Sequence, residues 1–118
     1  IRSGYSAFWA ANPDHEITSP PKTPGNAPSI LEYLYDTEAS LLGWDLQETG
    51  FRSDQYPARI AVHEVAIPHM GMPLLDNADF DALAEACKRN GRYEFHITIA
   101  PLVIKGGTGS PVNPIVTF

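Results

Sequence analysis

Residues 60–77, IAVHEVAIPHMGMPLLDN, join a long apolar segment to a short one across a single break. The first segment carries His63 in its middle, and the second ends on Asp76. Glycine and proline interrupt regular structure, so the Gly-Met-Pro break predicts a turn between a buried helix and a buried strand. A chain organised around such a unit folds as an α/β or α+β domain.

Two polar side chains of this stretch are candidates for a functional site. Asp76 lies at the carboxyl end of the predicted strand, and His63 lies on the helix before it. Strand ends beside a helix are common locations for sites in α/β proteins. The residues alone favour a structural interpretation, in which His63 is a hydrogen-bonded core residue and Asp76 caps the next helix, because two ligands do not make a metal site.

The remaining segments alternate between apolar patterns and clusters of turn-forming residues. We expect a strand end over 1–5, a surface loop over 6–27, helices over 28–40, 58–69 and 79–90, and strands over 41–45, 72–76, 92–104 and 112–118. Proline, glycine and asparagine clusters predict the loop over 6–27, and 47–57 and 105–111 are predicted to be a polar loop and a glycine-rich turn. Pro68 is expected to bend or end its helix.

Composition limits the possible functions. The 118 residues suffice for one small domain, and a hydrophobic content of 43% indicates a folded chain. The net charge of −6 argues against a nucleic-acid partner, and no apolar run approaches the roughly 20 residues that span a bilayer. The single cysteine, Cys87, excludes an intrachain disulfide and favours a cytoplasmic location. It shares a helical face with Phe80, Leu83 and Ala84, which predicts a buried, unreactive thiol.

Three segments, in order along the chain, resemble the C-terminal half of the cyclase family of metal-dependent hydrolases, which includes kynurenine formamidase and isatin hydrolase. The first is GWD at 43–45 with PARIAVH at 57–63, and the second is MGMPLLDN at 70–77 with LAEAC at 83–87. The third is YEF at 93–95, APL at 100–102 and GGTGSPVNP at 106–114. RSGY at 2–5 is similar to an Arg-Thr-Gly-Trp that ends a central strand in that family.

The resemblance implies a swivelling β/β/α fold, with residues 1–118 as its C-terminal portion, and hydrolysis of an amide, often a cyclic amide or a formamide. It also implies a divalent metal, zinc or manganese, with His63 and Asp76 at positions of metal ligands. The family usually has glutamate where this chain has Asp76, so the identity and number of metals stay open. His15, His69 and His96 are expected to be ordinary residues.

The family's other ligands come from a His-x-Gly-Thr-His-x-Asp motif, followed by a catalytic histidine, and this sequence has no such motif. The resemblance therefore implies activity only together with an N-terminal half, on another chain or segment, and we expect a small-molecule substrate and a homo-oligomer. The start on Ile1-Arg2-Ser3 also indicates a chain that begins in the middle of a larger fold. The alternative is a non-catalytic binding or scaffold module with the same fold. A phosphate-binding loop at 106–110 is disfavoured, because it matches neither a P-loop nor a dinucleotide fingerprint.

Overall fold

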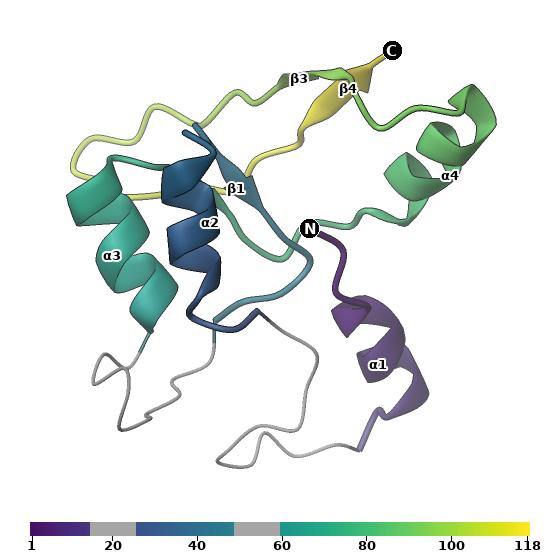
Figure 1. Ribbon diagram of the computed structural model, residues 1–118, viewed down its shortest axis with the longest axis horizontal. Helices are drawn as coiled ribbons and strands as arrows, with labels where there is room; N and C mark the ends of the chain where they lie inside the picture. The colour runs from purple at the N-terminus through teal and green to yellow at the C-terminus, as the bar shows by residue number, and fades with distance from the viewer. Residues whose placement is uncertain (15–25, 49–59) are drawn as a thin grey trace. The chain divides into compact units, whose positions relative to one another are not determined.

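The computed structural model describes residues 1–14, 26–48 and 60–118, which divide into two compact units, Ile1–Phe80 and Asp81–Phe118 (Figure 1). The first unit holds α1 (Tyr5–Ala11), α2 (Ile30–Asp36), β1 (Leu42–Gly43), α3 (Ala61–Met70) and β2 (Leu74–Leu75). The second unit holds α4 (Asp81–Asn90), β3 (His96–Thr98) and β4 (Ile115–Thr117). The mixed α/β class that the sequence predicts is confirmed, and none of the described helices is long and apolar enough to cross a membrane.

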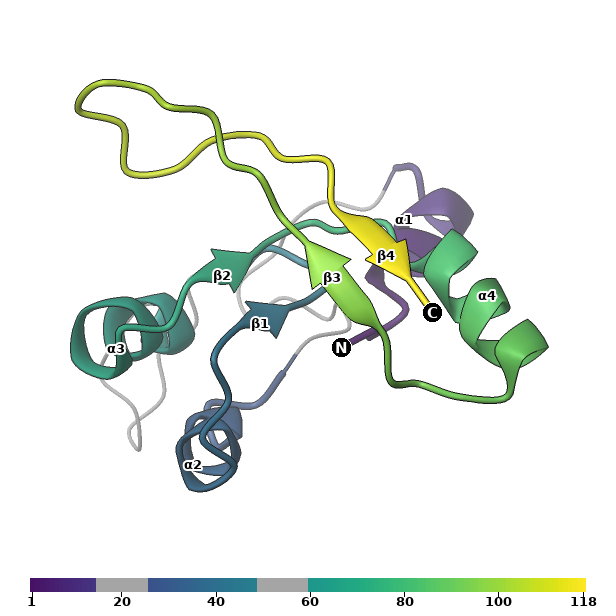
Figure 2. The same ribbon diagram turned by 90° about the horizontal axis from the view of Figure 1, so that it is seen from above.

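A parallel pair of strands organises the first unit. Leu42 of β1 pairs with Leu74 of β2, and Gly43 pairs with Leu75. Parallel strands need a long crossover connection, and α3 lies on the connection between them, as in a βαβ unit. In both views α2 lies beside α3 (Figures 1 and 2). The parallel pairing places the carboxyl ends of β1 and β2 at the same edge.

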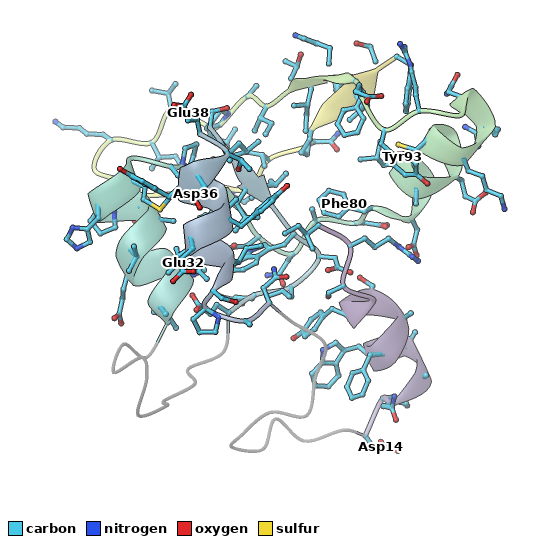
Figure 3. All side chains as sticks on the ribbon, in the orientation of Figure 1. Asp14, Glu32, Asp36, Glu38, Phe80 and Tyr93 are labelled. Carbon is cyan, nitrogen blue, oxygen red and sulfur yellow. The ribbon has the colours of Figure 1, made fainter. Side chains whose placement is uncertain are left out.

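The core of this unit forms where the helices meet the residues that follow the strands. Its buried members are Leu34, Leu42, Trp44, Leu46, Val62, Ala66 and Met72. Val62 and Ala66 are four positions apart, so they lie on one face of α3. The outer face of α2 is exposed and carries Glu32 and Asp36 (Figure 3). Burial thus fixes the face of α3, and with it the direction in which the neighbouring His63 projects.

Helix α1 corrects the prediction for the start of the chain, where a strand end and a loop were expected. Residues Tyr5–Ala11 are helical, and the helix stops at Asn12, before Pro13. Gly4 precedes α1 with φ at 88°, a left-handed conformation that glycine adopts without strain. The sequence prediction failed because it extended the turn signals of the proline-rich segment back to residue 6. Of the predicted loop, residues 12–14 and 26–27 lie outside any helix or strand, and 15–25 lie outside the described residues.

The other helices of the first unit match the prediction with changed ends. α2 is shorter than the predicted 28–40, and Glu38 after it has a positive φ of 53°. α3 does not end at Pro68 but continues to Met70, and Gly71, with φ at 65°, terminates it. A proline near a helix end removes only one backbone hydrogen bond, so the last turn still forms. Residues 49–59, which include most of the predicted polar loop and the start of the 58–69 helix, lie outside the described residues.

In the second unit, α4 ends at Asn90–Gly91 as predicted, with Gly91 at a φ of 63°. Cys87 is 2% exposed, which confirms its predicted burial. The long strand predicted over 92–104 is wrong. Only His96–Thr98 pairs, antiparallel to Ile115–Thr117. Beyond it, Pro101 has no N–H to donate to a ladder, and the N–H of Leu102 donates to the Ser110 hydroxyl at 3.0 Å.

The predicted turn between these strands is confirmed. Gly106 has a φ of 76°, and the N–H of Gly107 donates to the carbonyl of Ile104 at 3.0 Å. The strands predicted over 41–45, 72–76 and 112–118 all form but are shorter. The shortening has a common cause, because a strand is defined by its pairing and each of these extended segments is paired over only two or three residues.

Candidate functional site

His63 and Asp76 meet at the edge where the parallel strands end. His63 lies in the first turns of α3, and Asp76 directly follows β2. Nε2 of His63 is 2.9 Å from Oδ2 of Asp76, although the two residues are 13 positions apart in the chain. The sequence prediction that a helical histidine and a strand-end carboxylate lie close together is confirmed in this arrangement.

A third side chain, Glu48, completes the group. Its Oε2 lies 2.9 Å from Nδ1 of His63, so the imidazole is held between two carboxylates. We call Glu48, His63 and Asp76 the carboxylate–histidine site. Their side chains keep 16%, 21% and 29% of their accessible surface respectively, so solvent reaches the site.

Sequence reasoning missed Glu48 because the residue lies at the start of a polar stretch with no recognisable spacing to His63. One signal was present. Ile60, at the N-terminus of α3, has no side chain that could cap the helix. A helix start without a local cap needs an acceptor from elsewhere in the chain, and a carboxylate is a favoured one. The pattern indicated that an acceptor was needed but not which residue supplies it.

Trp44 orients the carboxylate of Asp76. The indole Nε1–H donates to Oδ1 of Asp76, while Oδ2 faces His63. Trp44 is 1% exposed, and the centre of its ring lies 6.0 Å from that of the imidazole. Because β1 and β2 are parallel and in register, Trp44 and Asp76 each follow the last paired residue of a strand. The fold thus assigns separate partners to the two oxygens of Asp76.

The two carboxylates control the charge of His63. Partial burial opposes protonation of the ring, but the hydrogen bonds that the protonated ring donates to Glu48 and Asp76, and the negative charges of these carboxylates, outweigh it. The pKa of His63 is therefore raised above its ordinary value. In the absence of a competing cation, the imidazolium form is the one that this arrangement stabilises.

The pair offers the donor types of a metal site. Two ligand atoms about 2.0–2.2 Å from one zinc ion in tetrahedral geometry are themselves roughly 3.3–3.6 Å apart. Nε2 of His63 and Oδ2 of Asp76 lie 2.9 Å apart, in a direct hydrogen bond, so the two side chains would have to separate slightly to admit an ion. A histidine that binds metal usually donates its other ring N–H to a carboxylate, the position that Glu48 occupies. Within the described part of the chain, however, no three histidine, cysteine or acidic side chains are arranged to hold an ion.

The structural interpretation of Asp76 as a helix cap does not match the structure. The next helix, α4, begins at Asp81, and the carboxylate of Asp76 contacts Trp44 and His63. The interpretation of His63 as a hydrogen-bonded core residue is confirmed for its hydrogen bonds but not for its burial, because the side chain keeps 21% of its accessible surface. His69 and His96 are exposed, on the last turn of α3 and on β3, and His15 lies outside the described residues.

No family model, curated protein or solved structure matches this chain. The case for a function therefore rests on the carboxylate–histidine site and on the resemblance of the sequence motifs.

Proposed function

We propose that this chain belongs to a metal-dependent hydrolase that cleaves an amide C–N bond, in a cyclic amide or a formamide. One observation carries the proposal: Nε2 of His63 and Oδ2 of Asp76 approach to 2.9 Å, and each residue is oriented by a further partner. A histidine nitrogen and a carboxylate oxygen are donor types that suit zinc or manganese.

His63 and Asp76 would hold the ion. When bound, such an ion lowers the pKa of a water molecule and polarises a carbonyl group, which is the chemistry of amide hydrolysis. The residues of this chain contribute the donor atoms and their orientation. Trp44 donates to Oδ1 of Asp76 and leaves Oδ2 facing Nε2 of His63. The site is partly exposed to solvent.

The proposal includes a second set of groups. Catalytic zinc sites use three protein ligands, and hydrolysis also needs a general base. We assign these to the N-terminal half of a swivelling β/β/α cyclase-like fold, on another chain or segment, in a homo-oligomer. The catalytic residues would lie in that half.

A binding or scaffold module is the second candidate, and one observation favours it. Glu48, His63 and Asp76 satisfy one another through direct hydrogen bonds, so the group forms a complete ion-pair network without a metal. In that case His63 serves to connect α3 to the strand edge. The two candidates differ in what they predict for metal content.

Metal analysis of the assembled protein, purified together with the chain or segment that supplies the other ligands, tests the proposal after exposure to zinc or manganese and dialysis. We expect Asp76→Asn, which keeps the size of the side chain and removes its charge, to lower occupancy by about tenfold or more. Asp76→Glu should retain the metal, since glutamate is the usual residue of the resembled family. Asp36→Asn, an exposed carboxylate on α2, is the control. Occupancy that is unchanged in Asp76→Asn would rule out Asp76 as a ligand and favour the scaffold module.

A further inference from the structure

Asn90 and Gly91, at the end of α4, form a pair with a chemistry of its own. Asparagine is a thermolabile residue, because the backbone nitrogen of the next residue can attack its side-chain amide. Of the five asparagines in the sequence, only Asn90 is followed by glycine. Proline has no backbone N–H to use in this attack, and the side chain of alanine hinders it. The other four asparagines precede one of these two residues: Asn12, Asn26, Asn77 and Asn113.

The surroundings of the pair are open. Asn90 is the last residue of α4, and both Asn90 and Gly91 are exposed. A Cβ atom built on Gly91 would meet nothing within 4 Å, so no neighbouring group blocks the backbone there. Water and hydroxide can therefore reach the backbone nitrogen and the side-chain amide.

Two hydrogen bonds restrain the reacting groups while the helix is closed. Nδ2 of Asn90 donates to the carbonyl of Ala86 at 2.8 Å. The backbone N–H of Gly91 donates to the carbonyl of Lys88 at 3.3 Å, which is longer than the usual range of about 2.7–3.2 Å. The reaction requires both bonds to break, and the ends of helices fray more readily than their interiors. The last turn of α4 therefore controls access to the reaction.

We propose that Asn90 is a site of spontaneous deamidation, gated by opening of the last turn of α4. Once the turn is open, the backbone nitrogen of Gly91 loses its proton to hydroxide and forms a bond to Cγ of Asn90. The bond from Cγ to Nδ2 breaks, and this nitrogen takes up a proton and leaves as ammonia. Water then opens the cyclic imide and leaves an aspartate or an isoaspartate. Water is the only co-reactant, and no oxidation or reduction takes place.

Neither product restores the end of the helix. An ionised carboxylate has no N–H to donate to the carbonyl of Ala86, and its charge lies at the negative end of the helix dipole. An isoaspartate adds a methylene group to the main chain, ahead of the bond of 3.2 Å from the N–H of Arg92 to the carbonyl of Cys87. Both products favour the open turn, so the modification acts in one direction. This inference does not depend on the proposed metal site.

The first test is peptide mapping by mass spectrometry of the full chain, incubated in mildly alkaline buffer with and without urea. Unincubated protein, digested in the same way, gives the background. We expect Asn90 to be the first asparagine to deamidate, at a rate about two- to tenfold lower without urea, because the end of a helix opens at little cost. Prior reaction of another asparagine in the native protein, or no reaction at Asn90 without urea, overturns the inference. Equal rates with and without urea rule out the gate.

The second test weakens the last turn without changing the reacting pair. Lys88 is exposed in this turn, and Lys88→Gly and Lys88→Ala both remove its charge. Glycine is less favourable than alanine in a helix, so we expect Asn90 to deamidate about two- to fivefold faster in Lys88→Gly than in Lys88→Ala in native buffer. In urea the two rates should agree. Equal rates in native buffer, or the same difference in urea, would count against gating by the helix.

A third measurement concerns the product. Asn90→Asp reproduces the aspartate form, and Asn90→Gln is the control that keeps a neutral amide. We expect amide hydrogen exchange in the last turn of α4 to be about two- to fivefold faster in Asn90→Asp than in Asn90→Gln. Equal exchange in the two variants would show that an aspartate here does not hold the turn open.

Discussion

Asp45 accepts two hydrogen bonds from Ser3, one from its backbone N–H at 2.8 Å and one from its hydroxyl at 2.7 Å, across 42 positions of the chain. Gly4 and Tyr5 add their own N–H groups to the same carboxylate. Asp45 is 4% exposed, so it is a buried charge held almost entirely by donors at the start of α1. The formation of α1 is thereby tied to the segment that follows β1.

This arrangement predicts a loss of stability in acid. Burial disfavours the charged carboxylate, but the hydrogen bonds from Ser3 and Gly4 outweigh it, and the pKa of Asp45 is lowered. Its contribution to the free energy of unfolding is present above the unfolded pKa, about 3.9, and is lost as the pH falls through the folded value. We expect urea denaturation to show a stability difference between wild type and Asp45→Asn at pH 7 that shrinks near pH 3. A difference that is constant with pH would contradict this.

Asp45 also explains why the start of the chain was predicted incorrectly. No residue near position 5 signals a helix, because the cap comes from residue 45 and is invisible to local patterns. The 79–90 segment was predictable, since its apolar spacing and its Asn90-Gly91 stop are local. In the same way, the sequence placed His63 and Asp76 on their elements, but Glu48 and Trp44 join them only through the tertiary fold.

The core of the first unit gives a direct prediction for stability. Leu34 is 4% exposed and lies on the buried face of α2, whereas Tyr35 on the same helix is 73% exposed. Leu34→Ala removes buried methyl groups and leaves a cavity, so we expect it to lower the free energy of unfolding by about 2–5 kcal/mol. Tyr35→Ala should change it by about 0.5 kcal/mol or less. Similar losses in the two variants, measured by chemical denaturation, would mean that α2 does not bury the face described here.

Cys87 should resist thiol reagents under native conditions. Its side chain, on α4, is 2% exposed, and a reagent cannot reach a buried thiol without local opening of the structure. Glu85 on the same helix is exposed, so the double variant Glu85→Cys with Cys87→Ala provides a thiol in a matched but accessible position. We expect that variant to react much faster than wild type in a colorimetric thiol assay. Equal rates would show that the α4 face carrying Cys87 is open to solvent.

The carboxylate–histidine site predicts a pH dependence of stability opposite to that of Asp45, with the larger contribution at low pH. Partial burial lowers the pKa of His63, but the hydrogen bonds that the ring donates to Glu48 and Asp76, and the negative charges of these carboxylates, outweigh it, so the folded pKa is raised. A raised pKa stabilises the fold fully below the unfolded value, about 6.5, and the contribution is lost as the pH rises through the folded value. With a chelator present to keep metals out, wild type should exceed His63→Gln in stability by more at pH 5.5 than at pH 9. Added zinc should reverse this trend if the metal binds, because the ion requires the deprotonated ring and so gains affinity as the pH rises.

Denaturation of both proteins at the two pH values, with chelator and with zinc, gives four differences in stability between wild type and His63→Gln to compare. An advantage of wild type that does not depend on pH in chelator would show that Glu48 and Asp76 do not hold an imidazolium between them.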